Sequence, residues 1–227
     1  MSAAPVIAID GPSGVGKGTV ARSVARRLGW HLLDSGSLYR ILALAAEKAG
    51  IAGTDQAAVA ALAPRLDIKF DIQDDENERI IVDGEELSAR VRAETTGALA
   101  SVIAVHPQVR AALLERQRAF RQPPGLVADG RDMGTVVFPD AGLKIFLDAS
   151  ADERARRRLI QLRKAGIESN IRALREEIRE RDVRDRSRSV SPLKAADDAV
   201  TIDTTELSVD AVLARVGQLI EARDYAT

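Results

Sequence analysis

Short apolar runs that end in polar residues recur along this chain, and segments with helical periodicity separate most of them. The runs are Val6–Asp10, His31–Asp34, Leu126–Asp129, Leu143–Asp148 and Ala199–Asp203. Strands that alternate with helices form parallel sheets, because each crossover helix covers one face of the sheet. The pattern therefore predicts an α/β fold in which a five-stranded parallel sheet is flanked by helices.

The apolar positions between these runs recur at the spacing of one helix face. After the first run they are Val20, Ala21, Val24, Ala25 and Leu28. Gly29 follows this predicted helix where a C-terminal cap belongs. Ser150 and Glu153 form a capping pair after the fourth run, and Ser208 opens the last helix.

One stretch has the two-residue period of paired strands instead. Apolar and polar residues alternate over 68–72, residues 74–77 have the composition of a turn, and 80–82 is apolar again. This predicts a small antiparallel β element. It lies in the long gap between the second and third runs. We therefore expect an insertion over 63–102, between helical segments 36–62 and 103–125, within a single domain that spans 1–227.

The composition limits the kind of protein. A chain of 227 residues with 45% hydrophobic content can bury one good core. Its net charge of -1 gives the whole molecule no general attraction for nucleic acid or an anionic membrane. The absence of cysteine excludes disulfides and thiolate metal sites. No segment resembles a signal sequence and no apolar run approaches about 18 residues, so we expect a cytoplasmic protein.

The first apolar run leads into a glycine-rich loop with a lysine near its end. The residues of this loop are Gly11, Pro12, Ser13, Gly14, Val15, Gly16, Lys17, Gly18 and Thr19. Glycines let the backbone turn tightly with its N–H groups inward, and the next helix directs its positive end to the same point. The stretch therefore predicts a polyphosphate site. It meets the pattern G-x-x-x-x-G-K, but Gly18 occupies the Ser/Thr position whose hydroxyl often binds Mg²⁺.

Two other interpretations of this loop are weaker. A simple glycine-rich turn with a solvated Lys17 would not need the strand before it and the helix after it. A dinucleotide-binding fingerprint fails, because Thr19 stands where its third glycine belongs.

Polar clusters also follow the second and third runs, and ligands gather at the carboxyl ends of parallel strands. Residues 34–40 place two hydroxyls, a phenol and a guanidinium near a helix N-terminus, which suits a second phosphate group. Alternatively, Ser37 only caps that helix. After the third run, Asp129 could orient Mg²⁺ through water, Arg131 could grip a phosphate and Asp132 could accept a hydrogen bond from an amino group. The alternative there is an ion pair that pins a turn.

A basic segment lies in the last third of the chain. Between Asp152 and Arg188 stand 13 Arg or Lys residues against 8 Asp or Glu. Most of these charges are expected on solvated helix faces. Arg181, Asp185 and Arg188 share one face if the helix continues that far, and such a face can hold sugar hydroxyls and phosphate. Residues 162–170 have the composition of a short mobile connection, so the segment could act as a lid.

Together these motifs closely resemble those of the bacterial cytidylate kinases, which belong to the nucleoside monophosphate kinases with a P-loop. The resemblance runs almost from end to end. It is carried by residues 9–19, 33–40, 129–139 and 181–186, and the third stretch is the most specific. The Gly18–Thr19 ending, unusual for a general P-loop, is normal in this family.

The resemblance implies a P-loop NTPase-type fold with a small monophosphate-binding subdomain over 63–102 and a lid over 154–170. It implies transfer of the γ-phosphoryl group of ATP to CMP or dCMP, giving ADP and CDP or dCDP in pyrimidine nucleotide metabolism. Mg²⁺ would accompany the nucleotide. The expected partners are these small molecules, without nucleic acid or membrane, and the expected state is a monomer.

The resemblance also assigns residues. Those expected at the cytosine edge are Ser101, Arg110 and Asp132, and those near the sugar are Arg181 and Asp185. Those expected around the acceptor phosphate are Ser35, Tyr39, Arg40, Arg131 and Arg188. The residues expected to offset charge on the transferring group are Lys17, Arg131 and Arg188. Arg154 and Arg158 share one helix face at i and i+4, and this spacing makes them the lid candidates for the same role. No residue is expected to bind Mg²⁺ directly, although Asp129 could act through water.

Three other functions fit parts of the sequence. A P-loop kinase of UMP, AMP or a non-nucleotide metabolite would share the loop and the arginines. A nucleotide-dependent switch is weaker, because the Asn-Lys-x-Asp guanine-reading signature is absent. An RNA-binding face over 154–188 is poorly supported, since aromatic residues make up only 3% of the chain and few interleave the basic ones.

Overall fold

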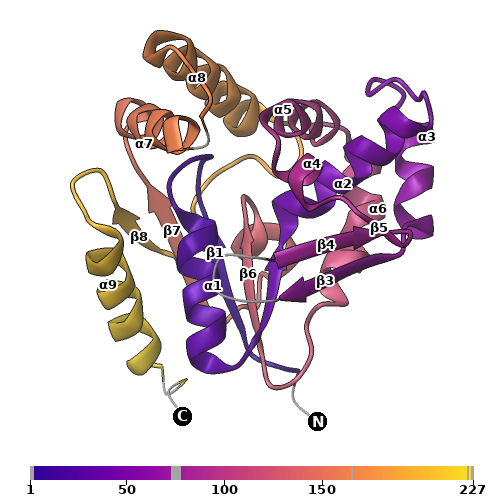
Figure 1. The fold of residues 1–227 in the computed structure, drawn as a ribbon. Coiled ribbons are helices and arrows are strands. Elements are labelled where there is room, and N and C mark those ends of the chain that lie inside the picture. The colour runs from indigo at the N-terminus through magenta and orange to yellow at the C-terminus, as the bar shows by residue number, and fades with distance from the viewer. Residues whose placement is uncertain (1–2, 73–77, 165, 224, 226–227) are drawn as a thin grey trace. The chain divides into compact units, whose positions relative to one another are not determined.

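The five apolar runs form one parallel sheet in the computed structural model, which describes residues 3–72, 78–164, 166–223 and 225 (Figure 1). The strands are β1 (Val6–Asp10), β2 (His31–Asp34), β6 (Leu126–Gly130), β7 (Leu143–Asp148) and β8 (Val200–Asp203). They lie in the order β2–β6–β1–β7–β8. β1 pairs in parallel with β6 and β7, and β7 with β8. The sequence prediction of a five-stranded parallel sheet flanked by helices is confirmed.

The chain divides into two compact units, residues 1–33 with 121–227 and residues 34–120. The helices of the first unit are α1 (Lys17–Leu28), α7 (Ala151–Lys164), α8 (Ile171–Ser187) and α9 (Val209–Glu221). A π-helical segment covers Met133–Val137. The helix α7 continues to Lys164, so the expected connection over 162–170 is shorter than the sequence predicts.

The core of the first unit lies between the sheet and two helices. Val20 and Val24 of α1, together with Val212 and Val216 of α9, join residues of β1 and β7 in one buried hydrophobic cluster. Every residue of β1 is buried, as expected for a central strand of a parallel sheet. This packing fixes the strand ends from which the functional loops leave.

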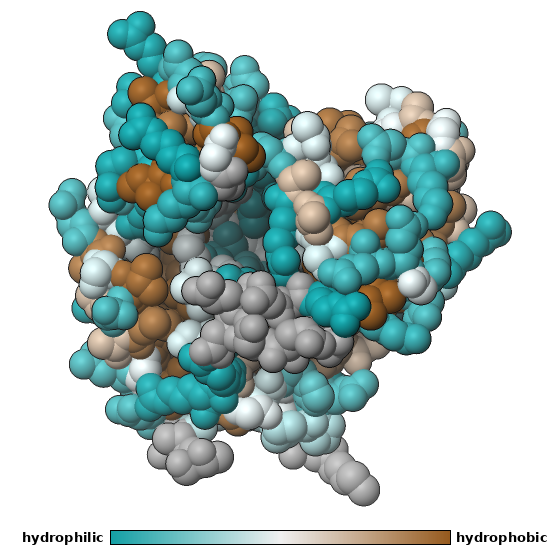
Figure 2. Space-filling model, in the orientation of Figure 1, coloured by the Kyte–Doolittle hydropathy of each residue, from teal (hydrophilic) through white to brown (hydrophobic). Residues whose placement is uncertain are grey.

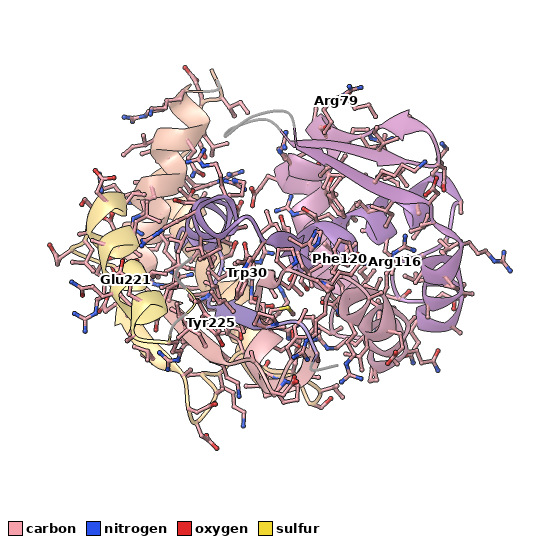
Figure 3. All side chains as sticks on the ribbon, turned by 90° about the horizontal axis from the view of Figure 1, so that it is seen from below. Trp30, Arg79, Arg116, Phe120, Glu221 and Tyr225 are labelled. Carbon is pink, nitrogen blue, oxygen red and sulfur yellow. The ribbon has the colours of Figure 1, made fainter. Side chains whose placement is uncertain are left out.

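Caps end these helices where the sequence predicts. Gly29 adopts a φ of 64° and its N–H bonds the last carbonyls of α1. The Ser208 hydroxyl accepts a hydrogen bond from the Ala211 N–H at 3.2 Å. Trp30, directly after the cap, meets the Tyr225 ring edge-on with centroids 5.3 Å apart (Figure 3). The residue that follows the cap of α1 therefore packs against Tyr225, the last residue that the structure describes.

The second unit combines helices with a small sheet. Its helices are α2 (Ser35–Lys48), α3 (Gln56–Leu62), α4 (Ser88–Arg92), α5 (Glu94–Ile103) and α6 (Pro107–Arg118), with a 3₁₀ turn over Ala63–Arg65. Its strands are β3 (Ile68–Ile72), β4 (Glu78–Val82) and β5 (Glu85–Glu86). β3 and β4 pair antiparallel with Phe70 opposite Ile80, which confirms the predicted β element. The predicted turn over 74–77 lies outside the described residues.

No single helix in the described part of the chain is long and apolar enough to cross a membrane. Among the helices that the structure describes, one pair, α5 and α6, meets that requirement of length and composition when taken together, and the two helices are bent by 108° relative to each other.

Candidate active site

The glycine-rich loop joins β1 to α1 in a conformation that glycine makes possible. Gly11, Gly14 and Gly16 have φ angles of 151°, 79° and 100°. A Cβ on Gly11 would lie 2.1 Å from the Leu147 carbonyl oxygen, so only glycine lets the loop pass this close to β7. Gly16 is the residue that precedes the first turn of α1. The loop therefore ends at the positive end of a helix, as a phosphate site requires.

Lys17 is a buried cation in this loop. It is 6% exposed, and its Nζ donates a hydrogen bond to the Pro12 carbonyl oxygen at 2.8 Å. Burial and the charge of Arg131 lower the pKa of Lys17 to about 8, although Asp129 and Asp10 oppose this. A lysine so poorly solvated gains from an anionic partner, because an opposite charge restores its protonated form.

Asp10, at the end of β1, holds the start of the next loop. Its two carboxylate oxygens accept hydrogen bonds from the backbone N–H groups of Met133 and Gly134, each at 2.8 Å. Burial raises the pKa of Asp10 to about 7, although the two N–H groups oppose the shift. The sequence analysis missed this residue. Its position at the end of a buried strand, directly before Gly11, was the available signal.

Arg131 and Asp132 leave the sheet between β6 and the π-helical segment. Asp132 is 3% exposed, and its carbonyl oxygen accepts hydrogen bonds from the N–H groups of Val136 and Val137 at 2.9 and 3.1 Å. Asp10 also holds the two residues that follow, so the backbone on the C-terminal side of Asp132 is fixed by several hydrogen bonds. Such a support shell holds a functional side chain in place.

Three of the predicted acceptor-side residues meet around Asp185. Its carboxylate accepts a hydrogen bond from Arg131 Nε at 3.0 Å and lies 3.4 Å from Arg188 Nη2. Burial would raise the pKa of Asp185, but the charges of Arg131, Arg188 and Arg181 outweigh burial and lower it. The helix α8 ends at Ser187, so Arg188 stands just beyond it and still reaches Asp185. The cluster gathers positive charge around one carboxylate, which suits a sugar phosphate.

The lid candidates lie on α7 in different surroundings. Arg154 is 2% exposed and forms an ion pair with Asp182 of α8. Arg158 is half-buried and donates to the Gln161 side chain at 3.3 Å. The surface over α7 and α8 is mostly hydrophilic, with single hydrophobic residues between (Figure 2). Val183 of α8 is an exposed hydrophobic residue, with 65% of its surface accessible.

A cavity of about 900 Å³ lies beside α8. The start of α7 and the loop that follows β8 form its other walls. Its lining includes Ala149, Ser150, Arg154, Asp182, Val183 and Thr205. Arg154 also donates a hydrogen bond to the Ser13 carbonyl oxygen of the phosphate loop at 3.1 Å, so this cavity borders the loop within the first unit. The sequence analysis did not identify it, because its walls come from three separate segments.

The second unit holds the other predicted acceptor-side residues, in two groups. In the first, Ser35 donates a hydrogen bond to the Gln117 side chain at 2.7 Å. Gln117 is 2% exposed and was missed, because nothing near it in sequence marks its partner. Asp34, and not Ser37, caps α2: it accepts from the Ser37 N–H at 3.0 Å and from its hydroxyl at 2.7 Å.

The second group surrounds Tyr39. The guanidinium carbon of Arg110 lies 5.6 Å from the centre of the Tyr39 ring, a cation–π distance. Arg40 donates to the carbonyl oxygens of Val91 and Ala93 at 2.8 and 2.9 Å. Ser101 is buried, and its hydroxyl has no hydrogen-bond partner within the described ranges. A buried hydroxyl without a partner is ready to bind a ligand.

Within the described residues, no group of three or more His, Cys, Asp or Glu side chains is arranged to hold a metal ion. Asp129 is 8% exposed, and its Oδ2 lies 3.4 Å from the point that a Cβ on Gly18 would occupy. One buried carboxylate beside a phosphate loop fits Mg²⁺ that keeps several waters and binds chiefly to phosphate oxygens.

Comparisons with known proteins point in one direction. A family model described as cytidylate kinase matches residues 7–222. The cytidylate kinase of Pseudomonas paraeruginosa (strain DSM 24068 / PA7) is 61% identical over 213 residues, which cover 93% of each chain. That of Aeromonas salmonicida (strain A449) is 57% identical over 94% of this chain and 92% of its own. That of Stutzerimonas stutzeri (strain A1501) is 56% identical over 98% and 97%.

Proposed function

The chain belongs to the cytidylate kinase family, and from this premise we propose that it transfers the γ-phosphoryl group of ATP to CMP or dCMP, giving ADP and CDP or dCDP. The observation that carries the proposal is the loop between β1 and α1. Its glycines and the buried Lys17 form a site for a polyphosphate at a helix N-terminus. The triphosphate of ATP fits this site.

The reaction needs no general base. The attacking phosphate oxygen of CMP is already anionic near neutral pH, so catalysis depends on positioning and on offsetting negative charge. Lys17 and the loop N–H groups would offset charge on the donor side. Arg131 and Arg188, which Asp185 holds together, would do so on the acceptor side, next to Arg181.

The acceptor base would be read by Asp132, with Ser101 and Arg110 as further contacts. Cytosine carries an exocyclic amino group where uracil carries a carbonyl. A buried carboxylate accepts a hydrogen bond from the amino group, whereas it would repel the carbonyl oxygen of uracil, which carries a partial charge of the same sign. Ser35, Tyr39 and Arg40 complete the proposed acceptor phosphate site.

Mg²⁺ would arrive with ATP. Asp129 fits this ion through a water molecule, because its buried carboxylate lies beside Gly18 and its charge acts on Lys17. When bound, Mg²⁺ would neutralise charge on the phosphates. The cavity between α7 and α8 is large enough for the adenine ring of the donor, and Ala149, Ala151 and Val183 give it apolar contacts among mostly charged and polar lining residues. A monomeric state and a cytoplasmic location stay predictions of the sequence.

Turnover of the purified protein with ATP and Mg²⁺ against CMP, dCMP, UMP and AMP tests the proposal. We expect ADP release with CMP and dCMP at a kcat/KM at least about tenfold above that with UMP or AMP. Faster turnover with UMP or AMP would assign another acceptor. ATP binding without turnover of any acceptor would favour a nucleotide-dependent switch.

A further inference from the structure

Two arginines near the start of α7 hold the outer side of the phosphate loop. Arg154 donates from Nη1 to the Ser13 carbonyl oxygen at 3.1 Å. One helical turn further on, Arg157 donates from Nη1 to the Val15 carbonyl oxygen at 3.2 Å. The two contacts lie on either side of Gly14.

These contacts matter because of how a peptide loop binds phosphate. The N–H and C=O of a trans peptide point in opposite directions, so N–H groups that face a phosphate leave carbonyl oxygens on the outer side. Carbonyl oxygens away from water need donors of their own. Arg154 and Arg157 supply those donors to Ser13 and Val15.

Arg154 is also fixed from behind. Its Nε donates to the Ala149 carbonyl oxygen at 3.0 Å, and its two Nη atoms donate to the Asp182 carboxylate of α8. The residue is 2% exposed. Most of its donors are therefore directed at protein oxygens, and moving its charge onto a phosphate would break several of these hydrogen bonds. Arg157 is anchored in the same way by Glu153, at 2.9 Å.

We propose that Arg154 and Arg157 are positioning residues of the ATP site. They hold the Ser13 and Val15 carbonyls outward and so fix the loop N–H groups toward the phosphates, and Asp182 keeps Arg154 in place. The inference rests on the proposed function, since it takes this loop as the ATP site. It gives Arg154 a role different from the lid contact with the transferring group that its helical spacing suggested.

Binding of Mg·ATP without an acceptor, measured by calorimetry, tests the proposal. A lysine cannot reach the same set of oxygens, so Arg154→Lys and Arg157→Lys should each raise the Kd about tenfold. Arg156→Lys is the matched control, because Arg156 lies on the same helix with a mostly exposed side chain that pairs with Glu153. Its Kd should stay within about twofold of the wild type. The KM for CMP and the kcat at saturating ATP should change less than about threefold in both test variants.

Asp182→Asn provides a second perturbation that keeps the size of the side chain. It should raise the Kd for Mg·ATP about threefold, and adding it to Arg154→Lys should produce little further change, because both act through one contact. If thermal unfolding shows that Arg154→Lys does not fold, Asp182→Asn and Arg157→Lys decide the question.

Two results would overturn the proposal. One is an unchanged Kd in Arg157→Lys and Asp182→Asn. The other is a kcat about a hundredfold lower in Arg154→Lys with an unchanged Kd, which would indicate direct contact with the reacting group. Failure of the proposed function remains distinguishable, since a wild-type protein that binds ATP but does not phosphorylate CMP still allows the binding comparison.

Discussion

The charge of Lys17 makes ATP binding depend on pH in a way that can be calculated from its surroundings. Burial and the charge of Arg131 lower its pKa to about 8, from an ordinary value of 10.5. The phosphates of Mg·ATP are fully ionised above about pH 7.5 and need the protonated lysine. Between about pH 7.5 and about pH 9, the protonated fraction of a group with this pKa falls about eightfold. The Kd for Mg·ATP should rise by the same factor, about 1.2 kcal/mol.

Calorimetry without an acceptor measures this effect, and buffers of different ionisation enthalpy report the proton taken up on binding. Lys17→Arg should show a flat profile, since arginine stays charged throughout. Lys144→Arg is the matched control, because Lys144 is also buried and also donates to a proline carbonyl five residues earlier, that of Pro139. It should keep the wild-type pH dependence.

The rise of the Kd for Mg·ATP with pH cannot result from unfolding that is caused by the deprotonation of Lys17. A lysine whose pKa is lower in the folded protein than in the unfolded chain binds fewer protons when folded, so its contribution to the free energy of unfolding grows as pH rises from 8 toward 10.5. A wild-type Kd that stays constant from about pH 7.5 to about pH 9 would refute the reasoning. So would a Lys17→Arg variant that keeps the wild-type slope.

Two further predictions concern the loop and the acceptor cluster. Gly11→Ala should lower the free energy of unfolding by at least about 2 kcal/mol in chemical denaturation followed by Trp30 fluorescence, because its Cβ would meet the Leu147 carbonyl. Gly29→Ala, with a positive φ but open space around it, should cost only about 1 kcal/mol, and equal losses would contradict the close approach. Asp185→Asn should raise the KM for CMP about tenfold, since a neutral side chain no longer holds Arg131 and Arg188. Because the pKa of Asp185 is lowered, its stabilising contribution is present above pH 3.8 and lost below it, so the stability difference between wild type and Asp185→Asn should vanish in acid.

The sequence predicts the sheet because its signals are local. Each apolar run ends within a residue or two of its strand, and the caps Gly29 and Ser208 act on their own helices. The glycine-rich loop could be recognised for the same reason, since the strand, the turn and the helix N-terminus that it needs are contiguous.

Contacts between residues far apart in the sequence were not predictable in this way, because they depend on how strands and helices pack. Asp10 bonds residues that lie 123 and 124 positions away, and it meets them because β6 pairs beside β1. Gln117 lies 82 positions from Ser35. For Arg154, helical spacing suggested a lid arginine near the transferring group, whereas the packing of α7 against α8 buries it on Asp182. Local pattern therefore identifies candidate residues, and tertiary packing decides what each one contacts.

Recognition of the cytosine amino group by Asp132 would distinguish this activity from that of other kinases with the same phosphate loop. The most direct measurement is the ratio of kcat/KM for CMP to that for UMP, in the wild type and in Asp132→Ala, with ATP and Mg²⁺ saturating. We predict that the ratio falls about 10- to 100-fold in the variant, mainly through loss of activity on CMP. An equal loss of activity on both acceptors, with the ratio unchanged, would contradict the claim.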